Sequence, residues 1–133
     1  MIFSVHLKTP ANTPASAPLI TRIPIVTGTI THMHVFFPPG CNALAHLKLR
    51  WGLYQLFPSN EQGDFASGGI LIDWAEDIEI DMAPLELDAY TWNEDTLYDH
   101  TITVDIVITP ASSTRNAQSV IQQVLAAQQP GIS

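Results

Sequence analysis

The stretch that decides the fold is residues 43–51, Ala-Leu-Ala-His-Leu-Lys-Leu-Arg-Trp, in which apolar and polar side chains alternate. Successive side chains of a strand point to opposite faces, so His46, Lys48 and Arg50 would share one face. The other face would carry only apolar residues, namely Ala43, Ala45, Leu47, Leu49 and Trp51. This period of two predicts a strand with one buried face.

The segment before this strand has a similar character. Residues 30–37, Ile-Thr-His-Met-His-Val-Phe-Phe, favour a strand, and Pro38-Pro39-Gly40-Cys41-Asn42 is a strong loop signal. We therefore expect residues 30–37 and 43–51 to pair as a hairpin. The other strand candidates are residues 2–7, 19–26, 53–57, 70–74, 77–81, 85–92 and 101–109.

About eight strands separated by turns rich in Pro and Gly are typical of an all-β sandwich or barrel. We predict an antiparallel β-sandwich domain over residues 1–110 and expect it to be jelly-roll-like, because eight strands divide into two four-stranded sheets. An immunoglobulin-like sandwich is the second choice. The length of 133 residues fits a single domain.

Two segments stand apart from the predicted strands. Pro10, Pro14 and Pro18 lie in or beside residues 9–18, which we expect to form an extended arm or loop, since Pro cannot occupy a central strand. Residues 111–133 are rich in Ala, Gln and Ser and are predicted to form a tail, either extended or with a short amphipathic helix. The apolar stripe of this tail comprises Val120, Ile121, Val124 and Leu125.

The composition excludes several classes of function. Thirteen acidic and five basic residues give a formal net charge of -8, which argues against binding to a phosphate backbone. No apolar run reaches the roughly 18 residues that span a bilayer, and the first residues do not resemble a secretory signal. The single cysteine, Cys41, excludes an internal disulfide and a cysteine-based zinc site. We expect neither nucleic acid nor membrane as a partner.

The charges are segregated along the chain. Only 14% of residues are charged, whereas a typical soluble domain has about a quarter. Residues 1–60 contain no acid, and residues 61–105 contain all thirteen acids and no base. The acids of residues 77–88 recur at a period of two, so we expect one strongly negative sheet face. Lys48 and Arg50 would lie beside it within one subunit or meet it across a subunit boundary.

Three histidines form the main candidate for a metal site. His32 and His34 would leave the same face of one strand, and His46 could lie opposite them on its hairpin partner. Three imidazole nitrogens with a water molecule would suit zinc. The alternative is three partly exposed histidines that contact water or carboxylates, and we expect no metal because no nearby carboxylate is evident to orient the rings.

Catalytic motifs are absent from the sequence. There is no Gly-x-Ser-x-Gly and no His-Glu-x-x-His, and Cys41 has no base nearby in sequence. The loop Asn93-Glu94-Asp95 with Asp99 offers oxygen ligands for calcium, but its spacing is not that of a known calcium loop, so a solvated acidic surface is expected. We expect no catalytic residues, no cofactor and no enzymatic activity.

Two aromatic residues suggest a binding function as an alternative. Tyr90 and Trp92 would share the polar face of one strand, where an exposed aromatic row could stack on sugars. Such a module would bind carbohydrate or a receptor. Trp and Tyr are also enriched at protein interfaces, and we favour the interface interpretation.

In architecture and composition, the chain resembles the small auxiliary (decoration or cement) proteins and other minor structural proteins of tailed-bacteriophage virions. The shared features are a compact sandwich, a Pro-rich arm, a C-terminal tail and few charges. The resemblance implies a virion protein that forms a homo-oligomer, such as a trimer, and binds other capsid or particle proteins after assembly in the host cytoplasm. We expect the interface to include Pro10, Pro14, Pro18, Lys48, Arg50, Val120, Ile121, Val124 and Leu125.

Overall fold

The computed structural model describes residues 1–111, which fold as two antiparallel β-sheets. Sheet A has the strand order β1-β9-β3-β7, and sheet B has the order β2-β8-β4-β5 with the short β6 paired to β4. In chain order the strands are β1 (Ile2–Thr9), β2 (Leu19–Pro24), β3 (Gly28–Phe37), β4 (Ala45–Trp51), β5 (Tyr54–Phe57), β6 (Phe65–Ala66), β7 (Ile70–Ile80), β8 (Glu86–Asn93) and β9 (His100–Pro110). The predicted antiparallel β-sandwich is confirmed. The tail was predicted for residues 111–133, and residues 112–133 lie outside the described residues.

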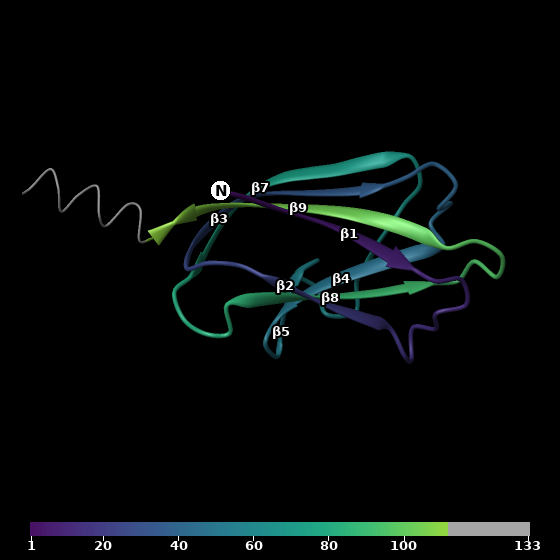
Figure 1. Cartoon of the computed structure of the whole chain (residues 1–133), viewed down its shortest axis with the longest axis horizontal. Helices are drawn as coiled ribbons and strands as arrows, with labels where there is room; N and C mark the ends of the chain where they lie inside the picture. The colour runs from purple at the N-terminus through teal and green to yellow at the C-terminus, as the bar shows by residue number, and fades with distance from the viewer. Residues whose placement is uncertain (112–133) are drawn as a thin grey trace, which may run out of the picture.

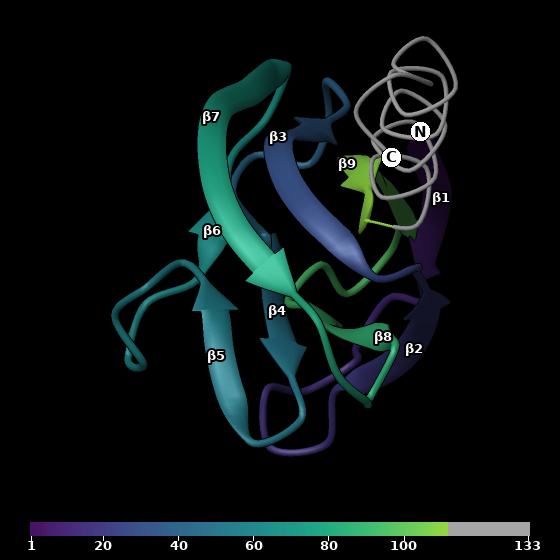
Figure 2. The same ribbon diagram turned by 90° about the vertical axis from the view of Figure 1, so that its left-hand side faces the viewer.

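The strand order is that of a jelly roll. Strands that follow one another in the chain mostly lie in different sheets, and the first and last strands, β1 and β9, are neighbours in sheet A. Figure 1 shows the two layers edge-on, with sheet A above sheet B. Figure 2 looks at one end of the sandwich, where the β4–β5 hairpin and the loop from β7 to β8 lie together.

Alternation along the strands builds the core between the sheets. On β9, Ile102, Val104, Ile106 and Ile108 are fully buried, and the residues between them face outward. Leu47 and Leu49 of β4 meet this layer from sheet B and are also fully buried. Burying a large aliphatic side chain contributes about 1.5–3 kcal/mol, so this apolar interior is the main source of stability.

One predicted pairing is wrong. Residues 30–37 and 45–51 do not form a hairpin, because β3 lies in sheet A and β4 lies in sheet B. The Pro38–Asn42 segment therefore crosses between the sheets instead of turning within one. A period of two fixes which side chains face inward, but it carries no information about which strands are neighbours.

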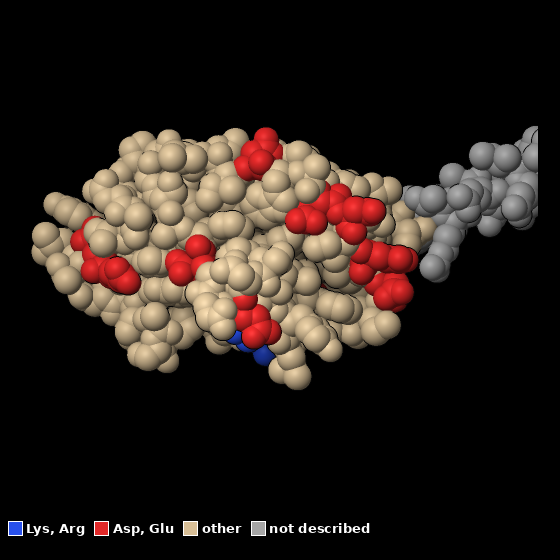
Figure 3. Space-filling view, turned by 180° about the vertical axis from the view of Figure 1, so that it is seen from behind, with Lys and Arg blue, Asp and Glu red and all other residues tan. Residues whose placement is uncertain are grey.

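The acidic residues also divide between the sheets. Asp77 and Glu79 lie on β7 of sheet A, whereas Glu86 and Asp88 lie on β8 of sheet B. The expected single acidic face is therefore wrong, because the chain changes sheet between the two pairs. Figure 3 shows carboxylates in separate groups across one face of the molecule, with cations only near its lower edge.

Gly28 begins β3 at a point where no side chain fits. A Cβ atom on this residue would lie 2.2 Å from the carbonyl oxygen of Thr109 on the neighbouring β9. The glycine therefore allows β3 to start in contact with both β7 and β9. In the described part of the chain, no helix has the length and apolarity required to cross a membrane.

Candidate functional site

An exposed apolar feature lies at the end of the sandwich where β1 begins and β9 ends (left in Figure 1). Here the β4–β5 hairpin and the loop after β7 enclose an open pocket of about 310 Å³. We call the apolar residues that line it, together with the adjacent Leu85, the apolar end surface. Its members are Trp51, Leu53, Tyr54, Met82, Ala83, Pro84 and Leu85.

The two sides of this pocket are held together by a side chain. The Nε1–H of Trp51 donates to the carbonyl oxygen of Pro84 at 2.6 Å. Gly52 has a φ of +59°, which lets the hairpin turn sharply directly after this tryptophan. Leu85 accepts a backbone hydrogen bond from Ile25 at 3.0 Å, so the loop is also fixed to the segment that follows β2.

The apolar end surface leaves large apolar side chains in water. Leu53 is 91% exposed, Tyr54 70% and Met82 60%. The residues that line the pocket include no charged side chain. Exposed apolar patches of this kind mark sites of protein interaction, and Trp, Tyr and Met are enriched in the cores of interfaces.

The sequence prediction did not single out this surface. Its signal was nevertheless present, because Leu53 follows Gly52 at a turn and Met82-Ala83-Pro84 separates two strands. Turns normally carry polar residues, so apolar residues there are informative. What the sequence did not reveal is that these two turns lie side by side, which depends on the jelly-roll topology.

The Pro-rich segment is a loop of the sandwich and not a free arm. It connects β1 to β2 and is bonded to the loop between β8 and β9. Its residue Asn12 donates its backbone N–H to the carbonyl oxygen of Asp95 at 2.9 Å, and Thr13 forms a β-bridge with Asn93. Pro10 and Pro14 are exposed and Pro18 is half-buried, so they line an ordered crossover.

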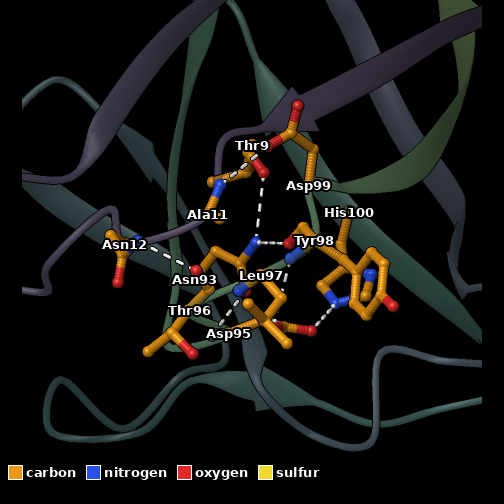
Figure 4. Close-up of polar contacts among 10 residues, drawn as sticks. All are labelled: Thr9, Ala11, Asn12, Asn93, Asp95, Thr96, Leu97, Tyr98, Asp99 and His100. Carbon is orange, nitrogen blue, oxygen red and sulfur yellow. Dashed lines mark hydrogen bonds and ion pairs between the residues drawn. The ribbon is translucent and has the colours of Figure 1, made fainter.

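The polar side chains of residues 93–99, the loop with possible calcium ligands, form hydrogen bonds with neighbouring protein groups (Figure 4). The buried Asn93 donates to the carbonyl oxygens of Thr9 at 3.2 Å and Tyr98 at 2.9 Å. The Asp95 carboxylate accepts the backbone N–H of Leu97 at 2.9 Å and contacts His100 at 2.8 Å. These contacts lower the pKa of Asp95 below its usual value, and the hydrogen bond from the Leu97 amide has the largest effect. The cluster fixes the loop.

Lys48 and Arg50 have partners within the subunit. Lys48 lies over the ring of Trp92, with Nζ 5.9 Å from the centroid, and donates to the carbonyl oxygen of Glu61 at 3.1 Å. Arg50 lies 5.2 Å from the ring centroid of Tyr90 and is paired in register with Asp88 of β8. One of the two arrangements expected from the charge pattern is a neighbouring acid within the subunit, and Asp88 has that position beside Arg50.

The faces of Tyr90 and Trp92 are covered from β4. The His46 ring stacks on Trp92 with 5.0 Å between centroids and an angle of 2° between planes, and Trp92 is only 8% exposed. Arg50 covers Tyr90 in the same way. A sugar could stack on these covered faces only after His46 or Arg50 moved, so the geometry gives the carbohydrate-binding alternative little support.

The three histidines do not converge. His32 and His34 lie on β3 of sheet A, whereas His46 lies on β4 of sheet B, so the three-histidine arrangement considered from the sequence does not form. Each group instead has carboxylate neighbours that the sequence did not reveal. His46 contacts Asp64 through Nδ1 and lies 3.4 Å from Glu94 through Nε2.

His32 and His34 lie beside acids of sheet A. Asp73 of β7 contacts Nε2 of His32 and lies 3.4 Å from Nε2 of His34. Within residues 1–111, these three side chains form the group of possible metal ligands that is compact enough to hold an ion. Their ligand atoms all lie within 4.8 Å of one another.

Four residues of the C-terminal tail were also predicted to belong to the interface. These residues, Val120, Ile121, Val124 and Leu125, lie outside the described residues.

Comparison with known proteins adds no assignment. No protein-family model, no curated protein and no solved structure matches this chain.

Proposed function

We propose that this chain is a non-enzymatic structural protein that associates with itself, as a trimer or another small oligomer, and stabilises a larger particle such as a phage capsid. The observation that carries the proposal is the apolar end surface. Leu53, Tyr54 and Met82 are exposed there beside Trp51, in a part of the molecule where the backbone is held by hydrogen bonds. An apolar surface on a fixed backbone is preorganised for binding.

The chemistry of this surface fits an interface between proteins. Aromatic residues and Met are enriched in interface cores and charged residues are depleted, which is the composition found around this pocket. The jelly roll also occurs in viral capsid proteins and in lectins, which agrees with a virion component only by analogy of fold. The low charge content, 14% of residues, fits a protein with much of its surface in contacts.

The test of self-association is the mass of the full chain in solution. Size-exclusion chromatography with light scattering at about 50 μM should give a small multiple of the chain mass. Leu53→Asp and Met82→Asp place a charge on the apolar end surface and should shift the mass to that of one chain. Leu97→Asp is the matched control, because Leu97 is 78% exposed in the loop between β8 and β9. This loop lies at the opposite end of the sandwich (right in Figure 1).

Two results would overturn this part of the proposal. One is a native chain that stays monomeric, and the other is an oligomer that survives both Leu53→Asp and Met82→Asp. The role in a particle is tested separately by quantitative mass spectrometry of purified virions from the source system. The chain should be present in a fixed ratio to the major capsid protein, and its absence would exclude a virion component.

A further inference from the structure

His34 of β3 lies between carboxylates on both neighbouring strands, and a second histidine lies beside it. On the outer face of sheet A, His34 is paired in register with Asp73 of β7 and with Asp105 of β9. His32 precedes it on the same strand and is flanked by Ala75 and Val107. Four side chains that bind metals or orient metal ligands therefore come together from three strands.

A β-bulge sets the orientation of the two histidines. The pairing of β3 shifts between Ile30 and His32 against both neighbouring strands. Ile30 and Met33 are both fully buried although they are three residues apart, so one extra residue is accommodated between them. His32 and His34 then leave the same outer face, with 4.8 Å between ring centroids and 82° between ring planes.

We propose that His32, His34 and Asp73 bind one divalent transition-metal ion, with zinc as the ion that the donors fit best. Two imidazole nitrogens and one carboxylate oxygen are ordinary zinc ligands, with distances to zinc of about 2.0–2.2 Å. Ligand atoms of a tetrahedral zinc site then lie roughly 3.4 Å apart. The distance from Nε2 of His34 to Oδ1 of Asp73 is 3.4 Å, and all three ligand atoms lie within 4.8 Å of one another. Nε2 of His32 is in direct hydrogen-bond contact with the same Asp73 oxygen, and the ion would replace this contact.

Asp105 lies within about 1 Å of the position from which it would form the outer hydrogen bond that such sites contain. Its Oδ2 lies 4.0 Å from Nδ1 of His34, on the side of the ring away from Asp73. A carboxylate on the second ring nitrogen fixes the orientation and the tautomer of a histidine whose other nitrogen binds metal. Asp105 is therefore a positioning residue for His34.

The charge around the site favours a cation. Within residues 1–111, the ion pairs of Asp73 and Asp105 are with histidines only, and no Lys or Arg neutralises either carboxylate. An ion bound by His32, His34 and Asp73 would join β3 to the edge strand β7 and leave a fourth position open to solvent. Metal binding is therefore expected to stabilise the attachment of β7.

Titration of the metal-free full chain with zinc chloride tests the site. Isothermal titration calorimetry should show one zinc ion per chain, and replacement of zinc by cobalt should give the visible absorption of a four-coordinate site. His34→Asn and Asp73→Asn should each weaken zinc binding at least about 100-fold, whereas Asp105→Asn should weaken it about 10-fold. His6→Asn is the matched control, because His6 lies on the outer face of the same sheet and contacts Thr103.

All of these side chains are at least partly exposed, so the variants are expected to fold, and circular dichroism checks this. Saturating zinc should raise the melting temperature of the native chain and of His6→Asn but not of Asp73→Asn. Binding at less than one equivalent, or affinities for His34→Asn and Asp73→Asn within threefold of that of His6→Asn, would overturn the proposal. The site does not depend on self-association, so either proposal can fail while the other stands.

Discussion

The indole Nε1–H of Trp51 donates to the carbonyl oxygen of Pro84 at 2.6 Å and joins the β4–β5 hairpin to the loop after β7. These residues are 33 positions apart in sequence; Trp51 ends β4 of sheet B, and Pro84 lies in the loop after β7 of sheet A. The hydrogen bond holds the two sides of the apolar end surface at a fixed separation. It is therefore the contact on which the shape of the proposed interface depends.

Trp51→Phe tests this contact because it keeps an aromatic ring and removes the donor. The change should lower the free energy of unfolding by about 1 kcal/mol, the usual net contribution of one hydrogen bond. Because the pocket also loses its fixed shape, the dissociation constant of the oligomer should rise several-fold. Urea unfolding and sedimentation at several concentrations measure the two effects. Unchanged association in this variant would show that the bond does not shape the interface.

A second prediction concerns the buried hydroxyl pair between the sheets. Thr9 of β1 donates to Thr91 of β8 at 2.9 Å, and both residues are fully buried. Thr9→Val should cost about 1.5 kcal/mol, because the Thr91 hydroxyl loses its partner without gaining water. The double variant with Thr91→Val should cost less than the sum of the single changes by about 0.5 kcal/mol or more. Additive costs in urea unfolding would contradict this coupling.

The start of β3 gives a third prediction. Gly28→Ala should lower the free energy of unfolding by about 2 kcal/mol or more, because the new Cβ would lie 2.2 Å from the carbonyl oxygen of Thr109. Gly40→Ala is the control for backbone strain alone. Gly40 has a φ of +102° and open space around it, so that change should cost only about 1 kcal/mol. Equal midpoints of thermal unfolding for the two variants would refute the steric explanation.

The fourth prediction is a pH dependence at Asp95. The amide of Leu97, the side chain of His100 and the amide of Tyr98 lower its pKa in the folded state. Since the folded pKa lies below the unfolded value near 3.8, the stabilisation is present above that value and is lost as pH falls through the folded pKa. Asp95→Asn should therefore lose less stability than the native chain between pH 5 and pH 2.5. If the urea concentration at the unfolding midpoint fell equally in the native chain and in Asp95→Asn over this pH range, the assignment would be contradicted.

The fold class followed from local patterns, and the strand neighbours did not. The alternation in residues 43–51 correctly placed Leu47 and Leu49 in the core. Pro24 lies on β2 at the edge of sheet B, which fits a residue that has no backbone N–H to donate. The hairpin prediction failed because the jelly roll pairs strands that are far apart in sequence, and a loop such as residues 38–42 looks the same whether it turns within a sheet or crosses between sheets.

The candidate sites depended on the same missing information. His32 and His34 were recognised from their spacing, but Asp73 and Asp105 join them only because β7 and β9 flank β3. In the same way, Leu53 and Met82 form one surface only because β5 and the loop after β7 reach the same end of the sandwich. Sequence patterns identified the chemistry of single strands, and the pairing of distant strands created the sites.

Hydrogen exchange at the loop after β7 tests the central claim, that the apolar end surface is an interface between protein molecules. The native chain and the Leu53→Asp variant are compared at the same concentration, with exchange measured at the amides of residues 81–83 and 85. These amides should exchange more slowly in the native chain, while residues 96–98 at the opposite end should exchange equally in both. Equal exchange of residues 81–83 and 85 in the two proteins would contradict the claim.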